Sequence, residues 1–180
     1  MPPTAPLPAT KPGPLRSEQI ILFRIGEQLF ALSSASVQEV RSADSLSGAA
    51  GDVRAAEVPK VRKFLRRGGT TLFVVNSAAH FGLPASEGIL IFVLRDTRTA
   101  LLVDAIEKMT SMTRLQALPL SFCHEERRWY RGLTALDQTV VPVVHPQGFL
   151  SAEELLLLDA ALPLDEASGE QTATGSELTQ

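Results

Sequence analysis

Glu18-Gln-Ile-Ile-Leu-Phe-Arg-Ile-Gly-Glu27 and Glu87-Gly-Ile-Leu-Ile-Phe-Val-Leu-Arg-Asp96 decide the fold of this chain, because they lie 69 residues apart and align without a gap. Three further pairs of segments align at the same offset: Ala31-Leu32 with Ala100-Leu101, Val37–Val40 with Ile106–Met109, and Leu72–Asn76 with Val141–His145. One offset therefore relates blocks that are far apart in the chain. We interpret them as two copies of one supersecondary unit.

Each copy has the pattern of β structure. In the first copy the aliphatic run Ile20–Ile25 is followed by the turn Gly26-Glu27 and a second run, Leu29–Leu32, which together predict a hairpin. In the second copy Ile89–Leu94 and Thr99–Val103 flank a polar turn. Short runs rich in Val and Ile favour small barrels or sandwiches over a βαβ sheet. A unit of about 70 residues is too small to be secure alone, so we expect two barrels that pack together.

Two segments depart from the β pattern. Val58–Arg67 places Val61, Phe64 and Leu65 at helical spacing, which predicts a helix there. Ser151–Glu154 has the spacing of a capping box and precedes an apolar run, so we expect a C-terminal helix from about Ser151 to Leu162 that packs on the barrels.

The composition is that of a globular protein, with 44% hydrophobic and 21% charged residues among 180. The net charge of −3 argues against a dedicated nucleic-acid binder, and a single cysteine, Cys123, excludes an internal disulfide framework. The apolar runs are too short to span a bilayer, and the N-terminus has no signal-peptide pattern, so we expect a soluble cytoplasmic protein.

The two ends differ in composition from the middle of the chain. Six prolines lie within the first fourteen residues, and residues 163–180 hold four acidic residues and no Lys or Arg. We expect a flexible tail over residues 1–17, a folded domain over 18–162 and an acidic disordered tail over 163–180.

Catalytic and cofactor-binding patterns are scarce. A small hydrolase could use His145 with Asp137 across a turn, but an exposed histidine at a strand end explains His145 more simply. Cys123-His124 lacks the spacing of a zinc site, and no phosphate-binding glycine loop is present, so we predict neither metal nor cofactor. The one local excess of positive charge comprises Lys60, Arg62, Lys63, Arg66 and Arg67. We interpret it as a solvated helix face or as a contact for an acidic partner helix.

The order of motifs resembles the CheW family, the adaptors that couple chemoreceptors to the histidine kinase CheA. The resemblance covers residues 18–162. It is carried by the opening hairpin Phe23–Leu32, Val37-Gln-Glu-Val40, Leu102-Val-Asp-Ala-Ile106, Arg131–Asp137 with the strand Val140-Val-Pro-Val-Val144, and the helix Ser151–Asp159.

The resemblance implies two five-stranded SH3-like barrels related by the internal repeat, a C-terminal helix and no catalysis. It implies two partners, the regulatory domain of a CheA-type kinase and the cytoplasmic tip of a methyl-accepting chemoreceptor, and no direct membrane insertion. From it we predict three groups of partner-binding residues. Val37, Glu39 and Val40 would lie near the receptor side, and Val74, Val75 and Val103 would support the surfaces from the strands. Phe64, Arg66 and Arg67 would belong to a loop in which Arg66 matches the arginine of the family's Asn-Leu-Arg-Gly motif.

The chain departs from the family where the family has Gly-x-x-Asn-Leu-Arg-Gly. Here the sequence is Val61-Arg-Lys-Phe-Leu-Arg-Arg67, Asn76 replaces a usual aspartate, and His145 replaces another. Glycine permits backbone conformations and close approach that arginine does not, so we expect that this segment cannot make the family's contacts unaltered. A CheW-fold module in a non-flagellar pathway with an altered partner therefore stands beside the chemotaxis adaptor as a hypothesis.

Overall fold

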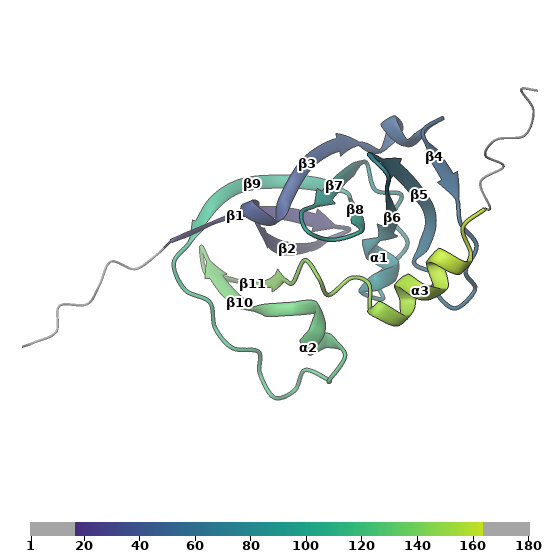
Figure 1. Ribbon diagram of the computed structural model, residues 1–180. Coiled ribbons are helices and arrows are strands. Elements are labelled where there is room, and N and C mark those ends of the chain that lie inside the picture. Colours follow the sequence, from purple (N-terminus) through teal and green to yellow (C-terminus); the bar gives the residue numbers. More distant parts are fainter. Residues whose placement is uncertain (1–16, 164–180) are drawn as a thin grey trace, which may run out of the picture.

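The computed structural model describes residues 17–163, which form two β-sheets, three short α-helices and two 3-10 turns (Figure 1). Sheet A has the strand order β10-β11-β2-β1-β9 and sheet B the order β3-β7-β8-β6-β5-β4. The strands of sheet A are β1 (Glu18–Ile25), β2 (Gln28–Ser33), β9 (Ala105–Met112), β10 (Tyr130–Leu136) and β11 (Thr139–Val144). The strands of sheet B are β3 (Val37–Ser42), β4 (Ala50–Asp52), β5 (Val61–Arg67), β6 (Thr70–Asn76), β7 (Leu90–Leu94) and β8 (Thr99–Val103).

The remaining elements are η1 (Ser34–Ser36), η2 (Ala43–Leu46), α1 (Ser77–His80), α2 (Glu126–Trp129) and α3 (Ala152–Ala160). The predicted class, all-β with two barrel-like halves and a C-terminal helix, is confirmed. Sheet B has one strand more than expected, the three-residue β4. The two predicted tails, 1–17 and 163–180, lie outside the described residues apart from their innermost residue.

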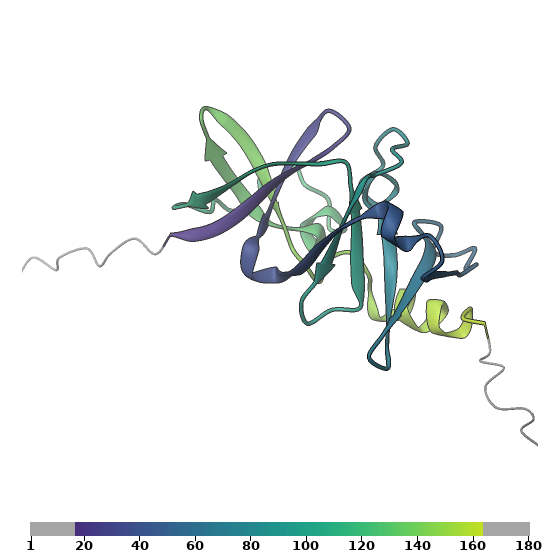
Figure 2. The ribbon, with the colours of Figure 1, turned by 90° about the horizontal axis from the view of Figure 1, so that it is seen from above.

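The two sheets exchange strands between the copies of the repeat. The hairpin β1–β2 pairs with β9 and β11 from the second copy, and the hairpin β7–β8 pairs with β3 and β6 from the first. Figure 1 shows β9 beside β1 and β3 beside β7, and Figure 2 shows the two halves lying side by side. Neither copy therefore builds a barrel from its own strands alone.

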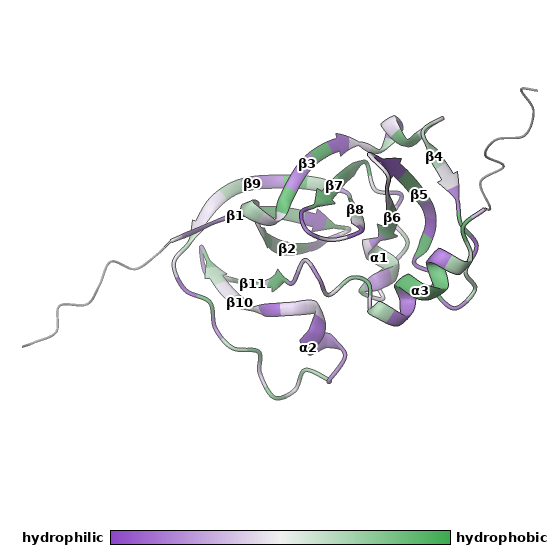
Figure 3. Ribbon diagram, viewed as in Figure 1, coloured by the Kyte–Doolittle hydropathy of each residue, from purple (hydrophilic) through white to green (hydrophobic). Residues whose placement is uncertain are grey.

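Three apolar clusters fill the part of the molecule that the structure describes. The largest takes side chains from both sheets, and its centre includes Phe23 and Phe92, whose rings meet edge to face with centroids 5.4 Å apart. These phenylalanines are equivalent positions of the repeat. Each hairpin turns its opposite face to a smaller cluster of its own sheet, around Leu22 in sheet A and Val93 in sheet B. Figure 3 accordingly shows apolar residues along the strands of both sheets, whereas α2 is hydrophilic.

The prediction of a helix over Val58–Arg67 is wrong, because most of this segment forms the strand β5. A register shift between Val61 and Lys63 adds one residue to β5, so that Val61 and Phe64 both lie in the large cluster although they are three residues apart. Leu65 enters the sheet B cluster on the opposite face. A bulged strand covered on both faces thus produced an apolar spacing that imitates a helix.

The predicted C-terminal helix is confirmed as α3. Ser151 is its N-cap, and Ser151 and Glu154 form the capping box. Leu158 is fully buried, and the carboxylate of Asp159 accepts two hydrogen bonds from Arg98 at 2.6 and 2.7 Å. α3 is thereby fixed to the large cluster and to the turn between β7 and β8. No helix within residues 17–163 has the length and apolar character needed to cross a membrane.

His80, at the end of α1, lies in an aromatic cluster that joins the two halves. Its ring centroid is 4.8 Å from those of Phe81 and Trp129 and 5.0 Å from that of Phe149. Its Nδ1 lies 3.4 Å from the Nζ of Lys60. Burial, and then the positive charge of Lys60, lower the pKa of His80 from 6.5 to about 3, so the imidazole is neutral in the folded protein.

The neutral state of His80 predicts acid sensitivity. The unfolded chain binds a proton on this histidine below pH 6.5, whereas the folded chain does so only near its pKa of about 3. The contribution of neutral His80 to the free energy of unfolding is therefore fully present above about pH 7, and it is lost as the pH falls toward 3. Urea unfolding at about pH 7 and about pH 4.5 should show that the wild type loses roughly 2–3 kcal/mol more than His80→Phe. An equal loss in both proteins would contradict the burial of a neutral imidazole.

Candidate partner-binding surface

All residues predicted to bind partners lie in sheet B, but they differ in exposure. Val40 on β3 is 41% exposed, Val37 and Glu39 are half-buried, and Arg66 and Arg67 at the end of β5 are exposed. Phe64, Val74, Val75 and Val103 are buried in the apolar clusters. These buried residues can shape a surface but do not form one, and the supporting role expected for Val74, Val75 and Val103 stays a prediction.

Glu39 connects β3 to β5, two strands that are not neighbours in sheet B. Its carboxylate pairs with Arg41 on its own strand and with Arg67 at 2.6 Å. The hydrogen bond from Arg41, and next that from Arg67, hold the pKa of Glu39 below its ordinary value. Glu39 is therefore ionised at neutral pH and lies between two guanidinium groups.

A shallow hollow of about 230 Å³ lies beside this ion cluster. Its rim carries Arg41, Arg66 and Arg67, and its floor is apolar, formed by Leu65, Leu72, Val93 and Ala49. We call Val37, Glu39 and Val40, with this hollow, the β3 surface. It lies around the edge of sheet B, because Glu39 faces the hollow and Val37 and Val40 face the other side of the sheet. An apolar floor inside a charged rim is a common arrangement at protein interfaces.

Phe64 supports the rim from below. A methyl group at Gly51 of β4 would overlap the Phe64 ring, so the neighbouring strand approaches this ring without any side chain. The guanidinium carbon of Arg66 lies 5.6 Å from the centre of the same ring, a cation–π contact. Phe64 thus contacts both the backbone of Gly51 and the guanidinium group of Arg66.

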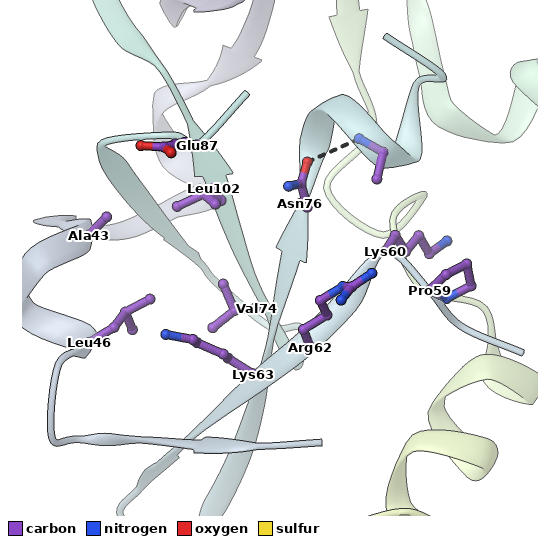
Figure 4. A pocket seen from close by; sticks show the side chains of 11 residues that line it. Ala43, Leu46, Pro59, Lys60, Arg62, Lys63, Val74, Asn76, Glu87 and Leu102 are labelled. Atoms are coloured by element: carbon purple, nitrogen blue, oxygen red, sulfur yellow. Dashed lines mark hydrogen bonds between the residues drawn. The ribbon is translucent and has the colours of Figure 1, made fainter. Parts of the chain in front are cut away.

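A larger groove of about 400 Å³ lies on sheet B near the start of β5 (Figure 4). Ala43, Leu46, Val74 and Leu102 give it an apolar floor, and Lys60, Arg62 and Lys63 give it a basic wall. Glu87 is the one acidic residue among those that line it. We call this the basic groove.

Asn76 also lines the basic groove, at the junction of β6 and α1. Its side-chain oxygen accepts a hydrogen bond from the Ala79 amide at 3.0 Å, shown as a dashed line in Figure 4, and so caps α1. An amide oxygen caps a helix about as well as a carboxylate. Asn76 therefore caps α1 without placing a negative charge in the groove.

The repeat produces a second exposed strand, β9, in sheet A. Ile106 and Met109 are the equivalents of Val37 and Val40, and Met109 is 63% exposed. Lys108 stands at the position equivalent to Glu39 and pairs with Asp137 at 3.1 Å. We call Ile106, Lys108 and Met109 the β9 surface. It matches the β3 surface in its aliphatic residues, but it carries Lys108 paired with Asp137 where the β3 surface carries Glu39 paired with Arg41 and Arg67.

The hydrolase hypothesis, with His145 and Asp137 as partners, is wrong. Asp137 lies in the turn before β11 and His145 follows the end of β11, so the six-residue strand Thr139–Val144 separates them by about 20 Å. His145 Nδ1 accepts a hydrogen bond from the Gln147 amide at 3.2 Å. Cys123 is free and exposed, and within residues 17–163 no group of three or more metal-ligating side chains comes together.

Comparison with known proteins agrees with this architecture. The family model for the CheW-like domain matches residues 19–154. The chain belongs to the CheW-like domain family. A probable chemotaxis protein CheW from Rhizobium etli is 25% identical over 147 residues, which cover 76% of this chain and 89% of that protein.

Among solved structures, the scaffolding protein TtCheW from Thermoanaerobacter tengcongensis has the same fold. It superposes with a TM-score of 0.59 at 16% sequence identity, and the match covers 72% of this chain and 90% of TtCheW. The CheW-like fold predicted from the motifs is therefore confirmed, and the assignment of its partner-binding residues stays a prediction.

Sequence reasoning missed several residues of these surfaces. Leu65 and Leu72, on the floor of the hollow, were not among the predicted residues, although Leu65 follows Phe64 directly. The Gly68-Gly69 pair was a usable signal, because both glycines have positive φ, 53° and 80°, and form a two-residue hairpin turn between Arg67 and Thr70. Recognising that turn would have predicted β5 as a strand.

The contact between Gly51 and Phe64 gives a test of how the rim is built. Gly51→Ala should lower the free energy of unfolding by about 1–3 kcal/mol, because the added methyl overlaps a buried ring. In a Phe64→Leu background the same change should cost clearly less, and the pair should couple in a double-mutant cycle measured by urea unfolding. Additive losses would show that Phe64 does not pack on Gly51.

Proposed function

We propose that this protein is a non-enzymatic adaptor in a chemosensory array. It binds the regulatory domain of a CheA-type histidine kinase and the cytoplasmic tip of a methyl-accepting chemoreceptor. The observation that carries this proposal is the match to the CheW-like domain over residues 19–154, supported by a relative named as a probable chemotaxis protein. Its place of action is the cytoplasm, at the receptor array.

An adaptor needs two separate surfaces, and the repeat supplies a physical reason for having them. The β3 surface and the β9 surface present similar aliphatic residues from equivalent strands. Their charged residues differ, because the β3 surface carries Glu39 with Arg41 and Arg67 whereas the β9 surface carries Lys108 with Asp137, so the two surfaces can discriminate between partners. We assign the receptor tip to the β3 surface, as the family resemblance implies, and the kinase to a different surface.

The proposed mechanism is the linkage of weak contacts. Two modest interfaces on one rigid body raise the effective concentration of each partner for the other, without any new contact between them. The shared apolar cluster and the exchanged strands fix the relative position of the two sheets. A rigid adaptor of this kind would hold receptor and kinase in one geometry.

The alternative within the same fold is a non-flagellar pathway with an altered partner. The specific observation that favours it is the basic β5, where Arg66 and Arg67 border the hollow and no glycine of the family's pattern remains in Val61–Arg67. Both hypotheses use the same surfaces, and they differ in which kinase and receptor of the genome are bound.

The adaptor proposal predicts a partner-specific defect. Val40→Glu replaces an exposed aliphatic side chain of the β3 surface by a carboxylate and so removes apolar contact area from it. Calorimetric titration should show binding to a chemoreceptor cytoplasmic fragment weakened about tenfold or more, with binding to the CheA regulatory domain unchanged. The matched control is Met109→Glu, at the equivalent position of β9, which should leave receptor binding unchanged.

Titrations should use every CheA and receptor encoded in the source genome. A wild-type protein that binds none of them would overturn the adaptor proposal. Binding only to a kinase from a non-flagellar gene cluster would support the alternative. Equal losses from Val40→Glu and Met109→Glu would overturn the assignment of the receptor to the β3 surface and leave the adaptor role in place.

A further inference from the structure

The basic groove has cations that the rest of the described chain does not neutralise. Lys60 pairs with Glu154 at 2.7 Å. For the side chains of Arg62 and Lys63, the structure of residues 17–163 holds no acidic partner, although both are exposed along the wall of the groove. An exposed cationic wall beside an apolar floor fits a segment that alternates carboxylates with aliphatic side chains.

The chain itself contains a segment with that chemistry. Residues 164–180 carry Asp165, Glu166, Glu170 and Glu177 and no Lys or Arg. Their two leucines are each next to an acidic residue, in Leu164-Asp165-Glu166 and Glu177-Leu178. Each of these pairs could place an aliphatic side chain on the floor of the groove and a carboxylate against its wall.

The described part of the chain ends close enough for this contact. The first turn of α3 touches the wall of the groove through the Lys60–Glu154 pair, and the nine residues of α3 span only about 14 Å. Arg98 and the buried Leu158 fix the other end of α3 against the same half of the protein, as Figure 2 shows for the yellow helix. Seventeen residues follow Pro163, and an extended chain covers about 3.3 Å per residue, so the length exceeds the span several times.

We propose that the acidic segment 164–180 docks into the basic groove of its own chain, with its carboxylates on Arg62 and Lys63 and a leucine on the apolar floor. Since the segment is tethered, its effective concentration at the groove is in the millimolar range, and a weak intrinsic affinity is enough for occupancy. The segment would then compete with any acidic partner for this groove. This inference concerns the isolated chain and does not depend on the proposed adaptor function.

The test compares the wild-type chain with a variant whose acidic segment is neutral, D165N/E166Q/E170Q/E177Q, by ¹H–¹⁵N NMR. At about 20 mM salt the amide shifts of Leu46, Arg62, Lys63 and Leu102 should differ between the two proteins. Raising the salt to about 500 mM should move the wild-type shifts to those of the neutral variant, because the contact is electrostatic.

Charge reversal in the groove completes the test. In R62E/K63E the spectral difference between acidic and neutral segments should disappear at the groove. The matched control is Arg114→Glu, an exposed arginine that does not line the groove, which should preserve the difference. A nitroxide on Ser168→Cys in a Cys123→Ser background should broaden the amides of β5 in the wild-type groove and not in R62E/K63E.

The proposal is overturned if the wild-type chain and the neutral variant have identical amide shifts at the basic groove at low salt, or if their shift differences concentrate on another surface. Shifts that grow with protein concentration would also overturn it, because they would mean that the groove takes the segment of a second copy. If the groove responds only to an acidic fragment of a receptor or kinase, its occupant is a partner and the proposal fails.

Discussion

The exchange of strands between the two copies of the repeat is the constraint on which the rest of the structure depends. Each hairpin completes its sheet with strands from the other copy, and the equivalent residues Phe23 and Phe92 meet in the cluster that both sheets share. His80 and its aromatic neighbours extend this junction toward α2 and α3. Removing either copy would therefore leave the other with unpaired strand edges and exposed apolar side chains, so the two barrel-like halves form one physical unit.

Because the two halves form one physical unit, the β3 and β9 surfaces keep fixed positions relative to each other. The β3 and β9 surfaces are equivalent in position, and they differ in their ion pairs, Glu39 with Arg41 and Arg67 on one and Lys108 with Asp137 on the other. A duplicated and then differentiated surface on a rigid body suits a protein that holds two partners. The basic β5 contributes cations to the hollow beside Arg66 and to the basic groove beside Lys63.

Local features of the fold were predictable from the sequence, and pairing across the chain was not. The Gly26-Glu27 turn and the capping box of Ser151 and Glu154 act within a few residues, so their patterns predicted β1–β2 and α3 correctly. The aliphatic pattern of Val37–Val40 indicates a strand but carries no information on whether it pairs with its own hairpin or with β7. For the same reason the Glu39–Arg67 pair, 28 residues apart, and the burial of Val75 and Val103 could not be read from spacing.

The claim that the two sheets form one unit is tested most directly by urea unfolding followed residue by residue in ¹H–¹⁵N spectra. The β10–β11 hairpin of sheet A and the β5–β6 hairpin of sheet B do not pair with each other, so their native peaks report on the two sheets separately. We expect both sets of native peaks to disappear with one common midpoint, since the shared cluster and the exchanged strands couple them. Loss of the β5–β6 peaks at a urea concentration where the β10–β11 peaks remain fully native would contradict the account.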